Sequence, residues 1–161
     1  MRARAVEVVD VGDRAGLEEA WRIRFEVFVD EQHVPVEEEV DARDEEPGTL
    51  HGLAYVDGVP AGTGRVLPDG IPGHVHVGRM AVRAPFRGSG VGAALMAHLE
   101  GAALAEYGIP DGGGRLSVVV TLSAQESAMG FYSRLGYAVV SGERYLDAGI
   151  WHQDMVRTVT V

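Results

Sequence analysis

The 161-residue sequence contains no cysteine, which excludes disulfide bonds, thiolate-bound metals and a cysteine nucleophile. It also lacks any apolar run close to the roughly 20 residues that a membrane-spanning helix needs. The first ten residues, Met1 to Asp10, have no apolar signal-peptide core. These absences predict a cytoplasmic protein that does not enter a membrane.

Basic residues are scarce relative to acidic ones. The sequence has 14 lysine and arginine residues in total and 24 aspartate and glutamate residues, which gives a formal net charge of −10. Binding to a nucleic-acid backbone requires a basic surface, so nucleic acid is not an expected partner. A negative surface would steer a cationic substrate toward the protein. The simpler interpretation is that the excess charge only keeps the protein soluble.

The remaining composition is that of a folded globular protein, with 46% hydrophobic and 24% charged residues and no repeat or linker. The length fits one domain over residues 1–161. Alternation and turn signals predict strands at 5–11, 50–56, 60–67, 74–82, 115–122, 137–140 and 150–161, with a hairpin turn at Asp57-Gly58. Helical spacing and caps predict helices from Asp13 to about Gln32, from Val91 to about Tyr107, and from a Ser123 cap to Leu135. This order indicates an α+β (mixed α/β) fold in which helices pack on a mixed sheet.

A glycine-rich loop, Arg87-Gly88-Ser89-Gly90-Val91-Gly92, lies between a predicted strand and a predicted helix. The first N–H groups of that helix carry partial positive charge, the glycines let an anion approach the backbone, and Arg87 adds a guanidinium suited to phosphate oxygens. A Walker loop is excluded because Gly92 is followed by two alanines. A dinucleotide-binding fingerprint matches the letters from Gly88 to Ala93, but that motif belongs to the first unit of a longer fold. A purely structural turn remains the alternative to a diphosphate site.

The segment Val77-Gly78-Arg79-Met80-Ala81-Val82, followed by this loop, resembles the acetyl-CoA-binding segment of the GCN5-related N-acetyltransferase (GNAT) family, whose pattern is Arg/Gln-x-x-Gly-x-Gly/Ala. Phe131-Tyr132 with Leu135-Gly136-Tyr137 resembles the second motif of that family. The stretches from Arg22 to Phe28 and from Glu143 to His152 are similar to its ElaA/YjcF-like branch. The resemblance covers nearly the whole chain. It implies a GNAT-like fold, with a mostly antiparallel central sheet that is splayed at the cofactor site and helices on both faces.

The resemblance also implies where acetyl-CoA, the donor substrate, would bind. Backbone groups of Met80, Ala81 and Val82 would pair with the pantetheine arm, and an amide near Met80 or Ala81 would polarise the thioester carbonyl. The pyrophosphate would lie on Arg87, Gly88, Ser89, Gly90, Val91 and Gly92. Many family members open the next helix with an asparagine that contacts pantetheine, whereas this chain has Ser123 there. The contact would fall to Ser123 or Gln125, unless Ser123 is only a helix cap.

Tyr132 is the candidate general acid. In many family members a tyrosine on this helix returns a proton to the CoA thiolate, and Tyr132 occupies the matching position. A phenol has an acidity suited to that step. The alternative is that Phe131 and Tyr132 form an aromatic pair in the core.

The sequence determines the acceptor side less well. An amine must lose a proton as it attacks, and the candidate bases are His74, His76, Glu37, Glu38, Glu39, Asp41 and His152. Of these, the predicted substrate-binding residues are Glu38, Glu39, His76 and His152. His74 and His76 share one strand face, but no third ligand accompanies them, so no metal site is predicted. Three interpretations are open for the acidic loop from Glu37 to Glu46: it binds an amine or polyamine, it is a solvated run of charges, or it pairs with Arg22 and Arg24 as a structural element.

Together these features predict an acetyl-CoA-dependent N-acetyltransferase that acts on a primary amine of a small acceptor by direct attack in a ternary complex. Two alternatives stay open. One is an acyl-CoA-binding sensor without turnover, and the other is an acyltransferase related to acyl-homoserine-lactone synthases, to which the start of the chain is faintly similar. The C-terminal segment from Thr158 to Val161 is a candidate edge strand that could pair in a homodimer.

Overall fold

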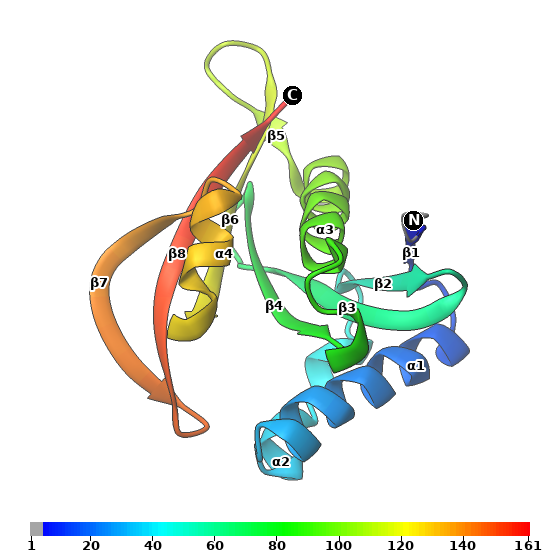
Figure 1. Ribbon diagram of the computed structural model, residues 1–161. Helices are drawn as coiled ribbons and strands as arrows, with labels where there is room; N and C mark the ends of the chain where they lie inside the picture. Colours follow the sequence, from blue (N-terminus) through cyan, green and yellow to red (C-terminus); the bar gives the residue numbers. More distant parts are fainter. Residues whose placement is uncertain (1–4) are drawn as a thin grey trace.

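The structure is a computed structural model that describes residues 5–161. One sheet runs through the molecule with its strands in the order β1-β2-β3-β4-β6-β8-β7, and the short β5 pairs with β6 (Figure 1). The strands are β1 (Val6–Asp10), β2 (Leu50–Val56), β3 (Val59–Pro68), β4 (His74–Val82), β5 (Ile109–Pro110), β6 (Leu116–Gln125), β7 (Ala138–Asp147) and β8 (Ile150–Thr160). The α-helices are α1 (Arg14–Arg24), α2 (Val36–Glu39), α3 (Val91–Tyr107) and α4 (Met129–Arg134). Within residues 5–161 no helix is both long and apolar enough to cross a membrane.

The sheet is mostly antiparallel, as predicted. Among its strand pairs only β4 and β6 run parallel within the described residues. The predicted bounds of β2, β4 and α3 agree with the structure. The turn between β2 and β3 has positive φ at both Asp57 (49°) and Gly58 (82°), the geometry that suits the twist of a two-residue hairpin.

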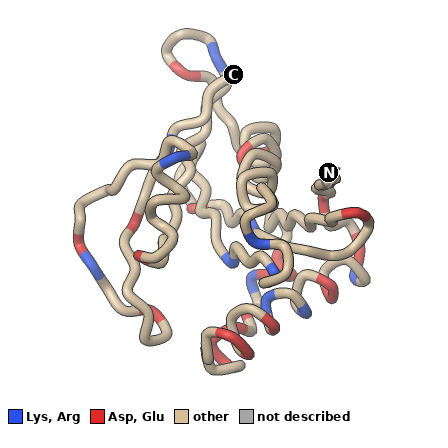
Figure 2. Tube along the Cα trace, in the orientation of Figure 1, with Lys and Arg blue, Asp and Glu red and all other residues tan. Residues whose placement is uncertain are grey.

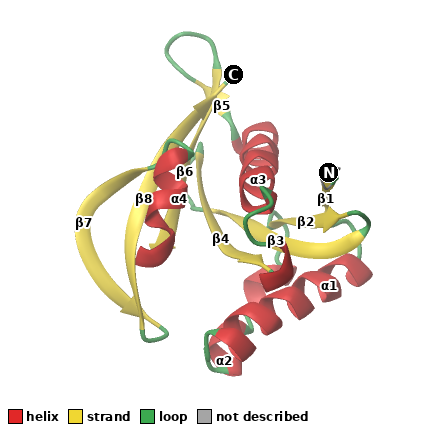
Figure 3. Cartoon of the chain, viewed as in Figure 1, coloured by secondary structure: helices red, strands yellow, loops and turns green. Residues whose placement is uncertain are grey.

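Helices cover both faces of the sheet (Figure 3). On one face α3 packs so closely that a Cβ atom on Gly64 of β3 would lie 2.7 Å from Leu99 Cδ1. On the other face α1 contributes Ile23, which belongs to the same core cluster as Leu53 of β2. The α4 helix lies on the α3 side, because Tyr132 shares the largest core cluster with Met96 and Leu99 of α3. On one face α1 thus covers β2, β3 and β4, on the other face lie α3 and α4, and β7 is largely exposed.

The splay lies between β4 and β6. These strands pair only from His74–Val119 to Val77–Leu122. Immediately afterwards β4 has a bulge, where Arg79 has a φ of 52° and the register with β3 shifts. Val77 and Met80 both face α3, although a regular strand would place residues three apart on opposite faces. The bulge therefore turns the end of β4 away from β6 and opens a gap in the sheet (Figure 1).

Several local predictions need correction. The helix capped by Asp13 is α-helical only to Arg24 and continues as a π-helical segment over Phe25–Glu31. The sixth strand extends to Gln125, so Ser123 is a strand residue and the prediction that it caps a helix was wrong. The seventh strand reaches Asp147, well beyond its predicted end. By contrast, the prediction of a C-terminal edge segment is confirmed for Thr158 to Thr160. Although β8 lies between β6 and β7, β7 pairs with it only as far as Val156, so within residues 5–161 this segment pairs with β6 alone.

Candidate active site

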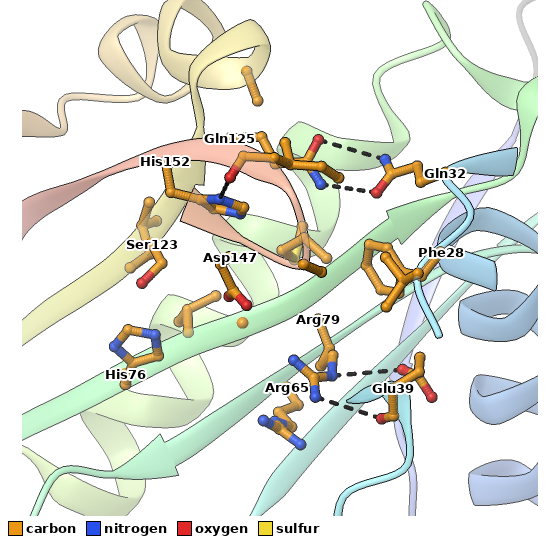
Figure 4. A pocket seen from close by; sticks show the side chains of 18 of the residues that line it. Phe28, Gln32, Glu39, Arg65, His76, Arg79, Ser123, Gln125, Asp147 and His152 are labelled. Atoms are coloured by element: carbon orange, nitrogen blue, oxygen red, sulfur yellow. Dashed lines mark hydrogen bonds and ion pairs between the residues drawn. The ribbon is translucent and has the colours of Figure 1, made fainter. Parts of the chain in front are cut away.

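A pocket of about 340 Å³ occupies the gap where β4 and β6 diverge. Its walls come from the bulged part of β4, the end of β6, the π-helical segment, α2 and the segment after it, α4, and the turn between β7 and β8 (Figure 4). Gln32 and Gln125 exchange amide hydrogen bonds of 2.9 and 3.4 Å, which tie the π-helical end to β6. The pocket is therefore assembled from segments that are far apart in the sequence.

Tyr132 reaches the pocket from α4. Its ring is 8% exposed and makes edge-on contacts with the rings of Phe131 and Tyr137, at centroid distances of 5.0 and 5.9 Å. The hydroxyl forms no hydrogen bond within residues 5–161, and burial raises the pKa of Tyr132 to about 12. The tyrosine is thus both a core residue and a protonated group that faces the pocket.

The pocket is reached from both faces of the sheet at the gap. Leu122 and Met155 are paired across β6 and β8 and point to the α4 face, where both are buried. Gln125 and His152 are also paired, three positions after Leu122 in β6 and three before Met155 in β8, so they point to the other face. Tyr132 and His152 therefore approach the same pocket from opposite faces.

His152 is held in one orientation by two contacts. Its Nδ1 atom lies 2.7 Å from the carbonyl oxygen of Ile150, and because a carbonyl only accepts, Nδ1 carries the hydrogen. The neutral imidazole then has its lone pair on Nε2. The ring also stacks on Tyr145, with a centroid distance of 5.9 Å and an interplanar angle of 18°. Burial and a hydrogen bond of 2.5 Å to Asp154 raise the pKa of Tyr145 to about 12.

The acidic loop after α1 folds onto buried arginines. Arg24 is 1% exposed, and its guanidinium binds Glu39 (Nε–Oε1, 2.7 Å) and Asp44 (Nη1–Oδ1, 2.9 Å). Arg65 binds the same Asp44 oxygen at 2.9 Å and Asp41 at 2.9 Å. Burial opposes the charge of Asp44, but hydrogen bonds from the two arginines outweigh it and lower the pKa of Asp44. The structural interpretation of this loop is confirmed for Arg24.

Arg22 and Glu38 do not join this buried ionic network through their side chains. Arg22 pairs with Glu19 on the surface of α1, so the expected contact between Arg22 and the loop was wrong. Figure 2 shows acidic and basic residues interleaved in this part of the molecule. Glu38 does line the pocket, where it lies beside Glu39.

Arg79 links the buried ionic network to the bulge in β4. Its Nη2 donates to the backbone oxygens of Glu38 (3.3 Å) and Glu39 (3.4 Å), and its Nε lies 3.5 Å from Glu39 Oε1 (Figure 4). Burial, reinforced by repulsion from Arg65 and Arg24, lowers the pKa of Arg79. These contacts hold a non-glycine residue in a positive-φ conformation and so stabilise the gap.

The glycine loop has the geometry of an anion site. Gly88 and Gly90 have φ values of 79° and 82°, in the region that favours glycine. Gly90 is the N-cap of α3 and provides no side-chain bond, so the first N–H groups of α3 have no side-chain acceptor at the cap. Arg87 is fixed beside them by a 2.9 Å bond from Nε to the Val82 carbonyl and a 2.8 Å ion pair with Glu31.

Two residues that were predicted to bind the donor, Gly92 and Ser123, also make contacts within the protein. A Cβ atom on Gly92 would lie 3.0 Å from Phe131 Cζ, so this glycine permits α3 to pack on α4. The Ser123 hydroxyl donates to Asp154 at 3.2 Å. Both residues thus have structural reasons for their positions.

The pocket brings together many of the predicted site residues: Met80, Ser123, Tyr132, Glu38, Glu39, His76 and His152. Ala81, Val82 and the loop from Arg87 to Gly92 lie outside its lining, along the diverging end of β4 and the start of α3. Sequence reasoning missed Gln32 and Asp147, which no local motif marks. Over residues 5–161 no group of three or more histidine, aspartate or glutamate side chains could hold a metal ion.

Comparisons with known proteins cover most of this chain. A family model described as an acetyltransferase (GNAT) domain matches residues 13–159. The uncharacterized N-acetyltransferase YjcF of Bacillus subtilis is 39% identical over 142 residues, which cover 88% of this chain and 91% of YjcF. A crystal structure of an acyl-CoA N-acyltransferase from Pseudomonas aeruginosa is 30% identical, with a TM-score of 0.77 over 95% of this chain and 99% of that one. Escherichia coli ElaA is 27% identical, with a TM-score of 0.79 over 95% and 99% of the two chains.

Proposed function

Because this chain belongs to the GNAT acetyltransferase family and is an acyltransferase, we propose that it transfers an acetyl group from acetyl-CoA to a primary amine of a small acceptor. The amine attacks the thioester directly in a ternary complex. The observation that carries the proposal is the gap between β4 and β6, which opens near the start of α3 and is lined by Tyr132.

The donor would lie along the open edge of β4. Beyond Val77 this edge has no strand beside it within residues 5–161. The pantetheine arm would therefore pair with the backbone of Met80, Ala81 and Val82 as an added strand. The diphosphate would receive hydrogen bonds from the first N–H groups of α3 and from the fixed guanidinium of Arg87. Ser123 lies across the gap, on the β6 side.

The chemistry requires a polarised carbonyl and a proton for the leaving group. As the C–N bond forms, the oxyanion would accept a hydrogen bond from a backbone N–H near Met80 or Ala81. As the C–S bond breaks, Tyr132 donates a hydrogen bond to the sulfur and returns a proton to the CoA thiolate. The acceptor would occupy the wall formed by Glu38, Glu39, His76 and His152.

The test is release of free CoA from acetyl-CoA over a panel of small primary amines, read with a thiol reagent. The chain contains neither cysteine nor lysine, so protein thiols and acetylation of its own lysines contribute nothing to the signal. We expect amine-dependent release and the intersecting initial-rate lines of a ternary complex, with the acetylated amine identified by mass spectrometry. Parallel lines would contradict direct attack.

Three other outcomes would redirect the assignment. No binding of acetyl-CoA in isothermal titration would overturn the proposal. Tight binding without turnover of any amine would favour an acyl-CoA sensor. A large preference for long acyl-CoA donors would favour an acyltransferase of different acyl specificity.

A further inference from the structure

The proposed transfer needs a base, and the carboxylates of the ionic network are unsuited to that task. Glu39 and Asp44 are bound by the buried guanidinium of Arg24 at 2.7 and 2.9 Å. Protonation of either carboxylate would leave a buried cation without its partner. Glu38 and Asp147 also line the pocket, but both are exposed at its rim. The enclosed proton acceptors that remain are the histidines.

Two histidines line the pocket, and they differ in their position along the gap. His76 lies where β4 is still paired with β6, beside Thr121, whose hydroxyl is 3.4 Å from His76 Nδ1. His152 is paired with Gln125, beyond Leu122, where the pairing of β6 with β4 has ended. His152 therefore faces the open part of the gap, and His76 faces its closed end.

The orientation of His152 exposes one specific atom. Nδ1–H is engaged by the Ile150 carbonyl, and the ring plane is fixed by the stacked Tyr145. Nε2 forms no hydrogen bond in the described part of the chain, and it carries the lone pair of the neutral ring. Figure 4 shows the ring on the same side of the pocket as Ser123 and His76.

We infer that His152 is the general base of the reaction, an assignment that rests on the proposed function. As the amine nitrogen bonds to the acetyl carbon, its proton passes to Nε2 while Nδ1–H stays bonded to Ile150. The C–S bond breaks, and Tyr132 supplies the proton that converts the thiolate into free CoA. The imidazolium then loses its proton to water, and the phenolate of Tyr132 regains one.

The arrangement also assigns a direction to each substrate. His152 points to the sheet face opposite α4, whereas Tyr132 approaches from α4 itself. The amine therefore enters from the His152 face and CoA leaves on the Tyr132 side. The base acts on the amine nitrogen and the acid on the thioester sulfur, so the two groups do not compete for the same space.

The test uses a substitution that keeps the structural bond of His152. In His152→Asn the side-chain amide can still donate to the Ile150 carbonyl, as Nδ1–H does, but Nε2 is lost. We expect kcat to fall by about 100-fold or more, with the acetyl-CoA Kd and the Tm close to wild type. Imidazole in the buffer should restore part of the activity of His152→Ala, in which the space of the ring is empty.

The matched control is His98→Gln. His98 lies on α3 outside the pocket and binds Asp10 at 2.7 Å. A His152→Asn enzyme within about threefold of wild-type kcat would overturn the assignment. So would an equal loss in His98→Gln, the absence of imidazole rescue, or a loss confined to His76→Gln. A wild-type enzyme that turns over no amine would instead overturn the proposed function, and the assignment of His152 with it.

Discussion

Replacing Tyr132 by phenylalanine should lower the catalytic rate without lowering the stability of the fold. A phenylalanine ring keeps the edge-on contacts with Phe131 and Tyr137. The lost hydroxyl has no hydrogen-bond partner within residues 5–161, so no protein group is left unpaired. We expect the free energy of unfolding of Tyr132→Phe to stay within about 0.5 kcal/mol of wild type.

The size of the kinetic effect follows from the acidity of the buried phenol. Burial raises the pKa of Tyr132 to about 12, whereas a thiol has a reference pKa of ~8.5. Complete proton transfer to the thiolate is therefore uphill by about 5 kcal/mol. In the transition state Tyr132 acts mainly as a hydrogen-bond donor to the charge on sulfur. Such a bond contributes about 1.5–3 kcal/mol, which corresponds to a fall of about 10- to 150-fold in kcat.

The assay combines steady-state thiol release with thermal unfolding, and Tyr137→Phe is the matched control. The Tyr137 hydroxyl donates to buried Glu100 at 2.7 Å, so its removal should cost about 1–3 kcal/mol of stability and leave kcat unchanged. A Tyr132→Phe enzyme that keeps more than about half of wild-type kcat would contradict the role of Tyr132. So would a Tyr132→Phe enzyme that is as destabilised as Tyr137→Phe.

The remaining predictions concern the ionic network and the glycine loop. Asp44→Asn removes the charge that binds buried Arg24 and should lower the free energy of unfolding by about 3–5 kcal/mol in urea denaturation. The pKa of Asp44 is lowered in the folded state, so the stability that its ionised carboxylate contributes is present at pH values above the reference pKa of ~4. This contribution is lost as the pH falls below ~4. In that acidic range the Tm of the wild-type protein should therefore fall more steeply with pH than the Tm of Asp44→Asn. Gly90→Ala places a side chain at a φ of 82° and should cost about 1 kcal/mol while weakening acetyl-CoA binding in isothermal titration. Arg87→Gln should raise the acetyl-CoA KM about tenfold, whereas Arg22→Gln on the exposed surface of α1 should not change it.

Local signals predicted those parts of the site that depend on neighbours in the chain. The bounds of β4 and α3, and the glycine loop between them, follow from strand composition, positive-φ glycines and a helix start within a few residues of one another. Tyr132 was instead identified by its match to the second family motif, and the structure places it in α4, after β6. Short-range geometry therefore indicated the segments to which we assign the donor.

The wall that we propose for the acceptor depends on contacts between distant segments, which a sequence pattern does not reveal. Nothing local favours a positive φ at Arg79, and its conformation is held by Glu38 and Glu39 of α2, about forty residues earlier. The run of acidic residues resembled a solvated surface, yet two of its members, Glu39 and Asp44, are buried against Arg24. Such pairings appear only when the sheet has brought the segments together.

The continuation of β6 through Ser123 is a second example. A serine followed by a helix is a typical N-cap, but pairing with β8 keeps Ser123 extended opposite Asp154. The same pairing places Gln125 opposite His152 and so determines which face His152 occupies. Tertiary pairing thus overrides the local capping signal.

The most direct test of the proposed site is a crystal structure with acetyl-CoA bound. We expect the acetyl carbon to lie in the gap between β4 and β6, with the CoA sulfur within about 3.5 Å of the Tyr132 hydroxyl and the carbonyl open to Nε2 of His152 from the opposite face. The diphosphate should lie at the N-terminus of α3. A thioester outside the gap, or one with Tyr132 and His152 on the same side of the acetyl carbon, would contradict the proposed site.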